Sequence, residues 1–402
     1  MNKKKESKVV PNVRFKGFTD DWKQRKLGEV ATFINGRAYS QDELQNSGKY
    51  KVLRVGNFYT NDSWYFSDME LDEKYYAKDG DLLYTWSATF GPHIWHGDKV
   101  IYHYHIWKVE LSNILEKRFA VQLLEQDKDK ILSDKNGSTM VHITKSGMEQ
   151  KKALLPPNIK EQANIGEYFS SIDRLITLHQ QKITLLTKLK KAMLEKMFPK
   201  KGAVIPEMRF NGFANAWEQR KLGDVAEIVR GASPRPISDP KWFDDNSDVG
   251  WLRISDVTNQ NGRIHYLEQH ISKLGQEKTR VITEPHLLLS IAATVGKPLI
   301  NYVKTGVHDG FLIFLNPSFD LEYMYQWLEM FRPEWNKYGQ PGSQVNLNSD
   351  LVKNQIIILP SEDEQKKISS FLKKFDHLIT LHQRKIDKLK NLKKAMLDQM
   401  LI

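Results

Sequence analysis

The sequence contains no cysteine, which excludes disulfide bonds and thiolate metal sites and agrees with a reducing compartment. It also lacks any apolar run approaching the roughly eighteen residues of a membrane span. Its first residues, MNKKKESKVV, lead from charge into Pro11 without the apolar core of a secretory signal. From these absences we expect a protein of the cytoplasm.

Motifs of catalysis are missing as well. No Gly-x-Gly occurs, so the dinucleotide fingerprint is absent, and no P-loop is present. An adenine methyltransferase would carry Asp/Asn-Pro-Pro-aromatic, but the one Pro-Pro pair here, Pro156-Pro157, precedes Asn158. Glu362, Glu364 and Lys366 could suggest a nuclease, although charge at the start of a helix is the favoured interpretation. We expect no catalytic residues.

What the sequence does have is positive charge on a folded chain. Its 402 residues include 60 Lys and Arg against 49 Asp and Glu, with a pI near 9.3. Such an excess makes a polyanion the default partner. With 40% hydrophobic residues and 10 Trp, the chain has enough apolar material for several cores. The charge therefore belongs to folded modules and not to a disordered tail.

The chain is also internally duplicated. RFKGFTDDWKQRKLGEVA begins at Arg14, and RFNGFANAWEQRKLGDVA begins at Arg209. Later, LPPNIKEQ from Leu155 is matched by LPSEDEQ from Leu359, and both copies continue through LITLHQ to KKAML. Between these anchors the similarity fades, while short traces such as LRVGN and LRISD remain in the same order. This is the pattern of one scaffold carrying two different surfaces.

The segments after Leu155 and Leu359 repeat apolar residues in alternating steps of three and four, which predicts two long helices. Lys190 and Lys393 interrupt this seam, and Leu189 and Leu392 beside them widen the apolar stripe. Two such helices can pair antiparallel as a coiled coil, in which a polar seam residue usually fixes the register. The seam residues expected at this pairing or partner surface are Ile172, Ile176, His179, Ile183, Leu186 and Met193, with Phe375, Ile379, His382, Ile386, Leu389 and Met396.

The regions between the anchors are rich in short β runs, including DLLYTWSATF, HLLLSIAAT, GFLIFL and NQIIIL. KVIYHYHIWKVEL alternates like a strand, with Ile101, His103 and His105 on one face. We expect an α+β fold in which two globules of mixed α/β structure alternate with two paired helices as a pseudo-two-fold repeat. The expected domains are a globule at 1–154, a helix at 155–200, a second globule at 201–358 and a second helix at 359–402.

Histidines gather in the first globule, at His93, His96, His103 and His105. They could suggest a metal site, but no carboxylate cluster surrounds them, and the second half has no counterpart. We favour strand and loop histidines, some of them facing nucleic acid, and expect no metal.

If the polyanion is DNA, its base edges are contacted by arginine, lysine, asparagine and glutamine, while serine and threonine help to position phosphates. Such side chains are expected on the loops of the globules. The candidates in the first globule are Arg37, Arg54, Asn57, Tyr59, Trp86, Lys135, Asn136 and Ser138. Those in the second are Arg230, Arg235, Arg253, Arg263, Lys297, Gln340, Ser343, Gln344 and Asn346. Arg54 and Arg253 lie in repeated strands and could instead belong to the scaffold.

The order of an R-F-x-G-F-x-x-x-W passage, a variable globule and an L-P-P/S-x-x-E-Q helix ending in K-K-A-M-L, all repeated once, resembles the specificity subunit of type I restriction-modification enzymes. The resemblance covers nearly the whole chain. It implies two target recognition domains, each binding one half of a split double-stranded DNA sequence. The paired helices would act as a spacer and bind two methyltransferase subunits.

The same resemblance implies that this chain binds no cofactor. S-adenosylmethionine, ATP and Mg would be held by the partners, which include restriction and translocase subunits. Helices of about thirty-three residues span roughly 50 Å, which exceeds the ~34–36 Å of one DNA turn. A scaffolding adaptor without a DNA role, with two interaction domains on a coiled coil, is the main alternative.

Overall fold

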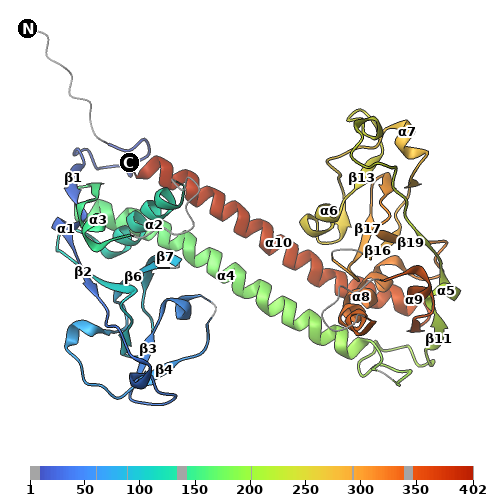
Figure 1. Cartoon of the computed structure of the whole chain (residues 1–402), viewed down its shortest axis with the longest axis horizontal. Coiled ribbons are helices and arrows are strands. Elements are labelled where there is room, and N and C mark those ends of the chain that lie inside the picture. The colour runs from blue at the N-terminus through green and yellow to red at the C-terminus, as the bar shows by residue number, and fades with distance from the viewer. Residues whose placement is uncertain are drawn as a thin grey trace, which may run out of the picture. The chain divides into compact units, whose positions relative to one another are not determined.

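A computed structural model of the chain describes residues 10–59, 61–87, 89–133, 143–200, 202–291, 294–338 and 347–401. It divides into two compact units, unit 1 (Met1–His179 with Arg384–Ile402) and unit 2 (Gln180–Gln383) (Figure 1). Each unit combines one globule with part of each of two long helices, α4 (Ile159–Met197) and α10 (Glu362–Met400). The expected order of globule, helix, globule and helix is therefore present.

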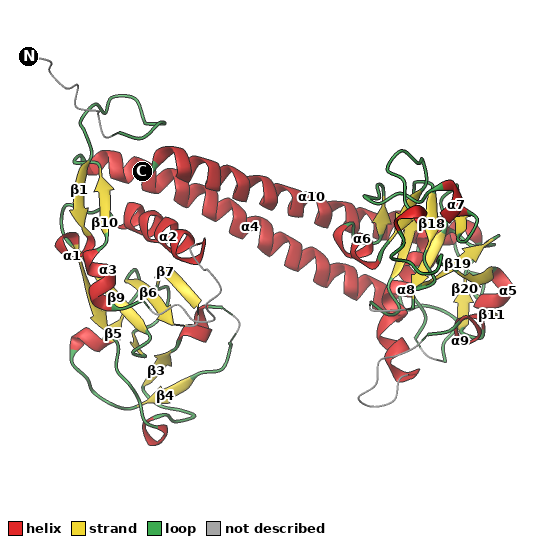
Figure 2. Ribbon diagram, turned by 45° about the horizontal axis from the view of Figure 1, so that its top comes forward, coloured by secondary structure: helices red, strands yellow, loops and turns green. Residues whose placement is uncertain are grey.

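The described residues of the globule in unit 1 form three sheets (Figure 2). Antiparallel β1 (Lys23–Lys26) and β10 (Lys152–Leu155) form the smallest. The other two have the orders β2 (Ala31–Asn35), β9 (Ile106–Leu111), β6 (Leu82–Ser87), β7 (Thr89–Ile94), and β4 (Tyr65–Ser67), β3 (Tyr50–Leu53), β8 (Val100–Tyr102), β5 (Tyr76–Ala77). The helices are α1 (Leu27–Val30), α2 (Lys117–Ser133) and α3 (Lys145–Gln150), with 3-10 turns η1 (Gln41–Glu43), η2 (Val55–Phe58) and η3 (Glu73–Tyr75).

The globule of unit 2 follows the same scheme. Antiparallel β11 (Glu218–Lys221) and β20 (Ile356–Leu359) form its two-stranded sheet. The larger sheets have the orders β12 (Glu227–Arg230), β19 (Phe311–Leu315), β16 (Leu287–Ser290), β17 (Pro298–Asn301), β14 (Arg263–Ile264), and β13 (Gly250–Leu252), β18 (Thr305–Val307), β15 (Arg280–Ile282). Its helices are α5 (Leu222–Val225), α6 (Ile254–Asn259), α7 (Lys273–Gln276), α8 (Leu321–Phe331) and α9 (Ser349–Lys353), with 3-10 turns η4 (Pro240–Trp242) and η5 (Arg332–Tyr338).

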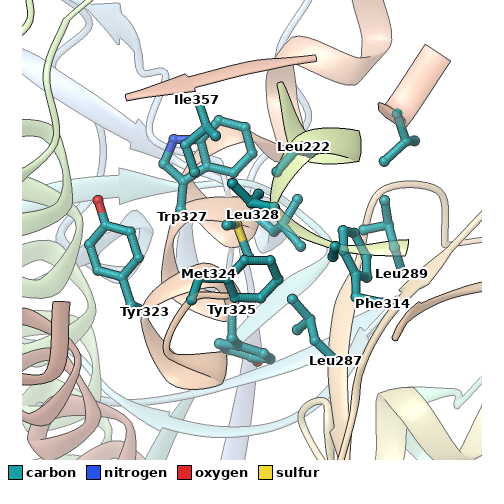
Figure 3. Close-up of a cluster of buried hydrophobic side chains, with 14 of the residues drawn as sticks. Leu222, Leu287, Leu289, Phe314, Tyr323, Met324, Tyr325, Trp327, Leu328 and Ile357 are labelled. Atoms are coloured by element: carbon teal, nitrogen blue, oxygen red, sulfur yellow. The ribbon is translucent and has the colours of Figure 1, made fainter. Parts of the chain in front are cut away.

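The core of unit 2 lies between α8 and its largest sheet. Figure 3 shows Met324 and Leu328 of α8 facing Leu287 and Phe314 of the sheet, all of them fully buried. The last residues of α4, with Ile368 and Leu372 of α10, belong to the same cluster. In unit 1, α2 packs likewise on β2, β6 and β9, in a cluster shared with α4 and the end of α10. The long helices are therefore part of both globular cores.

The repeated passages join each globule to a long helix. Arg14 reaches Glu161 of α4 through two hydrogen bonds, Nε to Oε1 at 2.5 Å and Nη2 to Oε2 at 2.8 Å. Arg209 makes the same pair of bonds to Glu364 of α10, at 2.7 and 2.8 Å. Both carboxylates are removed from solvent. The paired geometry explains why an arginine and a distant glutamate recur together in the sequence.

The glutamine after each glutamate has an equally specific task. The Gln162 amide donates to the Pro156 carbonyl and accepts from the backbone of Glu116, at 2.8 Å in both cases. Gln365 makes the matching bonds to Pro360 and Asp320, at 2.9 and 3.0 Å. Each glutamine thus satisfies backbone groups at the start of the long helix and at the entry to α2 or α8, where unpaired polar groups would be costly.

All predicted seam residues of α4 and α10 are buried or half-buried, whereas Leu189 and Leu392 are exposed and do not widen the seam. The two seam lysines are paired: Lys393 lies 2.6 Å from Asp173 in unit 1, and Lys190 lies 2.5 Å from Asp376 in unit 2. Within each unit the two helices therefore contact each other. A coiled coil along their whole length stays a prediction.

One strand expectation was wrong. KVIYHYHIWKVEL does not form a single strand, because β8 ends at Tyr102 and β9 begins at Ile106. The amide of Ile106 donates to the His103 carbonyl at 2.9 Å, which closes a tight turn. The alternation in the sequence continues through this turn by coincidence, so His103 and His105 lie in a loop and not on the face of a strand.

Candidate nucleic-acid interface

In unit 1, three predicted base-contacting residues are engaged in their own loops. Arg37 pairs with Glu43 at 2.6 Å. Asn57 donates to the carbonyls of Asn61 and Ser63 and accepts from the backbone of Arg54, which shapes the η2 turn. The Arg54 guanidinium lies over the ring of Tyr65, 4.2 Å from its centroid. These contacts favour a scaffold role for Arg54, the alternative considered for it from the sequence.

Aromatic and imidazole rings gather on the same globule. The exposed Tyr59 donates to or accepts from His93 at 3.1 Å, and His93 stacks on Phe58 with 4.1 Å between ring centroids. Trp86 donates to the Tyr104 carbonyl at 2.9 Å and stacks on buried Trp107. Partly exposed aromatic rings held in this way are suited to contact nucleotides.

Burial keeps two histidines of this surface, His93 and His103, in the neutral form. Burial lowers the pKa of His93 to about 4, and Lys128 acts in the same direction. Burial, with smaller effects of His105 and Arg54, lowers the pKa of His103 to about 4. A neutral imidazole has both a donor and an acceptor nitrogen, so these rings offer hydrogen bonding without charge. In the described part of the chain, no three His, Asp or Glu side chains gather as metal ligands would.

In unit 2, several predicted residues are also engaged internally. Arg253 pairs with Asp256 and Glu268, at 3.2 and 2.9 Å. Lys297 lies 4.0 Å from Glu329. Arg253 also lines an open depression of about 660 Å³ whose walls include Trp251 and His308.

Arg263 is largely buried and engaged by acidic side chains, and its assignment as a DNA contact stays a prediction. Its side chain is 16% exposed, and it pairs with Glu322 at 2.7 Å and with Asp376 at 3.5 Å. Its guanidinium also lies over Tyr325, 3.8 Å from the ring centroid. Sequence alone could not show this burial, because an arginine on a short β run is usually exposed.

Arg230 and Arg235, by contrast, are both exposed, and both contact Asp309. Arg230 Nε donates to the carbonyl oxygen of Asp309 at 2.6 Å, and Arg235 Nη2 lies 2.5 Å from its carboxylate. A third exposed arginine, Arg280, donates from Nε to the carbonyl of Arg230 at 2.8 Å. Neither Arg280 nor Asp309 was predicted from the sequence. We call Arg230, Arg235 and Arg280 the arginine cluster.

The loops that carry these groups occupy matching places in the two globules. The amide of Gly36, just after β2, donates to the carbonyl of Ile106, the first residue of β9. In the same way, the amide of Gly231, just after β12, donates to the carbonyl of Phe311, the first residue of β19. A Cβ at either glycine would collide with backbone carbonyls of the β8–β9 or the β18–β19 loop. The scaffold therefore places His103–His105 in unit 1 where unit 2 has 308–310, so equivalent loops carry different chemistry.

Seven predicted residues fall outside the described part of the chain, namely Lys135, Asn136, Ser138, Gln340, Ser343, Gln344 and Asn346. Their assignment as DNA contacts stays a prediction. None of the helices in the described ranges combines the length and the apolar character that a membrane span needs.

Known proteins resemble this chain over nearly its whole length. The curated MjaVIII specificity subunit of Methanocaldococcus jannaschii, a type I restriction enzyme component, is 25% identical over 95% of this chain and 92% of its own length. The putative MjaX specificity subunit of the same organism is 22% identical over 95% and 93%.

Solved structures share the fold. The type I restriction-modification S subunit from M. genitalium matches with a TM-score of 0.65 and 13% identity, covering 98% of this chain and 99% of that one. A chain from a type I R-M system complex matches with a TM-score of 0.55 and 17% identity, covering 95% and 98%. The family model of the type I restriction modification DNA specificity domain matches twice, at residues 19–188 and 215–391. Since these two repeats cover most of the chain, it belongs to this family, the non-catalytic DNA-recognising part of type I restriction modification systems.

Proposed function

We propose that each globule of this specificity protein binds one half of a split DNA target, while α4 and α10 set the spacing of the halves and bind methyltransferase subunits. The observation that carries the proposal is the contrast between a repeated scaffold and unlike loops. Arg14 with Glu161 recurs as Arg209 with Glu364, whereas the matching loops differ. Unit 1 has His103, Tyr104 and His105 where unit 2 has His308, Asp309 and Gly310, and Asp309 contacts two arginines of the arginine cluster.

Partner binding is supported by leucines that the seam leaves uncovered. In unit 1 these are Leu175 and Leu178 of α4 and Leu392 of α10. In unit 2 the equivalent positions are Leu378 and Leu381 of α10 and Leu189 of α4, joined by Leu185. Rows of exposed leucine on a helix are typical of surfaces that another helix covers. Two equivalent rows fit two copies of one partner, each presenting an amphipathic helix.

The division of labour follows. The partners supply the S-adenosylmethionine, ATP and Mg chemistry, and this chain selects the DNA sequence on which they act. The complex works in the cytoplasm, where the DNA and the partners are found. Its net charge of +11 adds non-specific attraction to phosphates, which weakens as salt rises. An adaptor without a DNA role would lack this salt-dependent DNA binding.

The experiment is a globule exchange in the assembled complex. Residues 22–155 are replaced by the equivalent globule of a relative, and methylated sites are mapped across the host genome. We expect one half-site to change and the other to remain. Replacement of Leu175 and Leu178 by serine should reduce methyltransferase binding without altering the half-sites that remain methylated. If both half-sites changed in the exchange, or neither did, the modular proposal would be wrong.

The spacing role has its own test. Insertion of one heptad into both helices adds about 10 Å at 1.5 Å per residue, or roughly three base pairs at 3.4 Å each. The methylated half-sites should move apart while their bases stay the same. An unchanged spacing would show that the helices do not set it.

A further inference from the structure

The arginine cluster of unit 2 is organised around one aspartate. Asp309 follows β18 in the loop to β19, and its carboxylate is 23% exposed. Ser233 donates to that carboxylate at 2.9 Å, and the amide of Asp309 donates back to the Ser233 hydroxyl at 3.1 Å. His308 Nδ1 lies 3.1 Å from the same carboxylate but accepts from the Gly310 amide at 2.8 Å, so the two bonds with Ser233 hold the aspartate. The aspartate is thus fixed before it meets either arginine.

Stability does not explain the ion pair with Arg235. The Arg235 side chain is 70% exposed, and exposed pairs contribute little to folding. What the pair does is restrict a long side chain to one direction, which lowers the entropy lost when that side chain binds a ligand. Only Nη2 of Arg235 contacts Asp309, so in the described structure Nε and Nη1 have no protein partner.

The base that matches one directed guanidinium group in double-stranded DNA is guanine. Arginine donates two hydrogen bonds to O6 and N7 of guanine in the major groove, which is the commonest specific contact. We propose that Asp309 is a positioning residue that aims Arg235, with Arg230 beside it, at a guanine in the half-site bound by unit 2. This inference rests on the proposed function and names the base chemistry of its second half.

Unit 1 provides the internal contrast. The residue before the close-packed glycine is Asn35 in unit 1 and Arg230 in unit 2. In the opposing loop, unit 1 has Tyr104 at the position of Asp309. Arg37, whose backbone pairs with His103 of this loop, is turned toward Glu43. We therefore expect the guanine requirement that depends on Asp309 and Arg235 in the second half-site alone.

The test uses the full chain assembled with its methyltransferase subunits and a DNA library in which both half-sites are varied. Arg235→Ala should lower the preference for guanine at one position of the second half-site by about 5- to 150-fold. The first half-site should be unaffected. Asp309→Asn should relax the same position, and the double variant should show no further loss, because the aspartate acts through the arginine. Arg220→Ala, which removes an exposed, ion-paired arginine elsewhere in unit 2, is the matched control.

Arg235→Lys separates base recognition from charge. Lysine keeps the positive charge but not the two-pronged geometry, so the guanine preference should fall while the salt dependence of binding is retained. Full preference in Arg235→Lys would overturn the proposal, as would equal weakening of all sequences by Arg235→Ala. An unaltered preference in Asp309→Asn would overturn the positioning role. Retained selection of the other bases of the second half-site shows that unit 2 of each variant is folded. A wild-type complex that selects no split site would instead refute the proposed function.

Discussion

The buried pairs that join globule to helix allow a sharp test of what holds this scaffold together. In unit 1, the Glu161 side chain is 0% exposed and the Arg14 side chain 13%. Arg14→Met would remove both of its hydrogen bonds and leave a buried carboxylate without its cation. Breaking a buried pair from one side costs about 3–5 kcal/mol. For a unit of this size that corresponds to a fall in melting temperature of roughly 6–20 °C.

The same pair predicts a specific non-additivity. When both partners are replaced by apolar side chains of similar volume, the cost is often near zero, because no charge is left buried. Arg14→Met combined with Glu161→Met should therefore be more stable than Arg14→Met alone. The assay is urea denaturation followed by hydrogen exchange of the β1–β10 sheet, which reports on unit 1 separately.

Unit 2 serves as the comparison. Arg209 makes the equivalent two bonds to Glu364 and one more, to the carbonyl of Asn215 at 2.7 Å. Arg209→Met should therefore cost at least as much in unit 2 as Arg14→Met costs in unit 1. A loss below about 1 kcal/mol, the range of exposed pairs, would refute the reasoning. So would a double variant as unstable as the sum of its single variants.

Three further predictions concern packing and pH. Asp173→Ala leaves the half-buried Lys393 without its partner and should destabilise unit 1 by about 1–3 kcal/mol, between exposed and buried pairs, as thermal denaturation would show. Gly166→Ala places a Cβ 2.7 Å from the backbone of α2 and should cost about 1–3 kcal/mol, whereas Ser369→Ala at the equivalent place in α10 should cost less. Because the pKa of His93 is about 4 in the folded chain, unit 1 should lose stability as pH falls from 6.5 towards 4, and His93→Phe should flatten this dependence in urea titrations.

Much of the fold follows from the sequence because the duplication is direct and the helical period is regular. The short β runs that led to β6, β16, β19 and β20 were also identified. The pairing of β1 with β10, more than a hundred residues later, was not, since alternation shows that a strand exists but not which strand it meets. The turn at His103–His105 was missed for a related reason, because alternating residues can continue through a tight turn.

The candidate interface was less predictable than the fold. Arg230, Arg235 and Arg263 satisfy the same criterion, a basic residue on a variable segment, yet Arg263 is largely buried whereas the other two are exposed. Asp309 fails that criterion because it is acidic, although it holds two of the arginines. Residue type therefore indicates which side chains can contact DNA, while their direction depends on neighbours that are distant in the sequence.

The seam lysines show how the scaffold tolerates different surfaces. In unit 1, Asp173 accepts from Lys393 of the other long helix and from Gln122 of the globule, at 2.6 and 3.2 Å. In unit 2, Asp376 accepts equivalently from Lys190 and Gln326, at 2.5 and 2.7 Å. A polar residue in an apolar seam specifies register, because any shift would leave a charge unpaired. Each carboxylate binds a side chain of the globule and a lysine of the other long helix, so the same contact also fixes the globule on the two helices. The β8–β9 and β18–β19 loops take no part in this contact and are therefore free to differ.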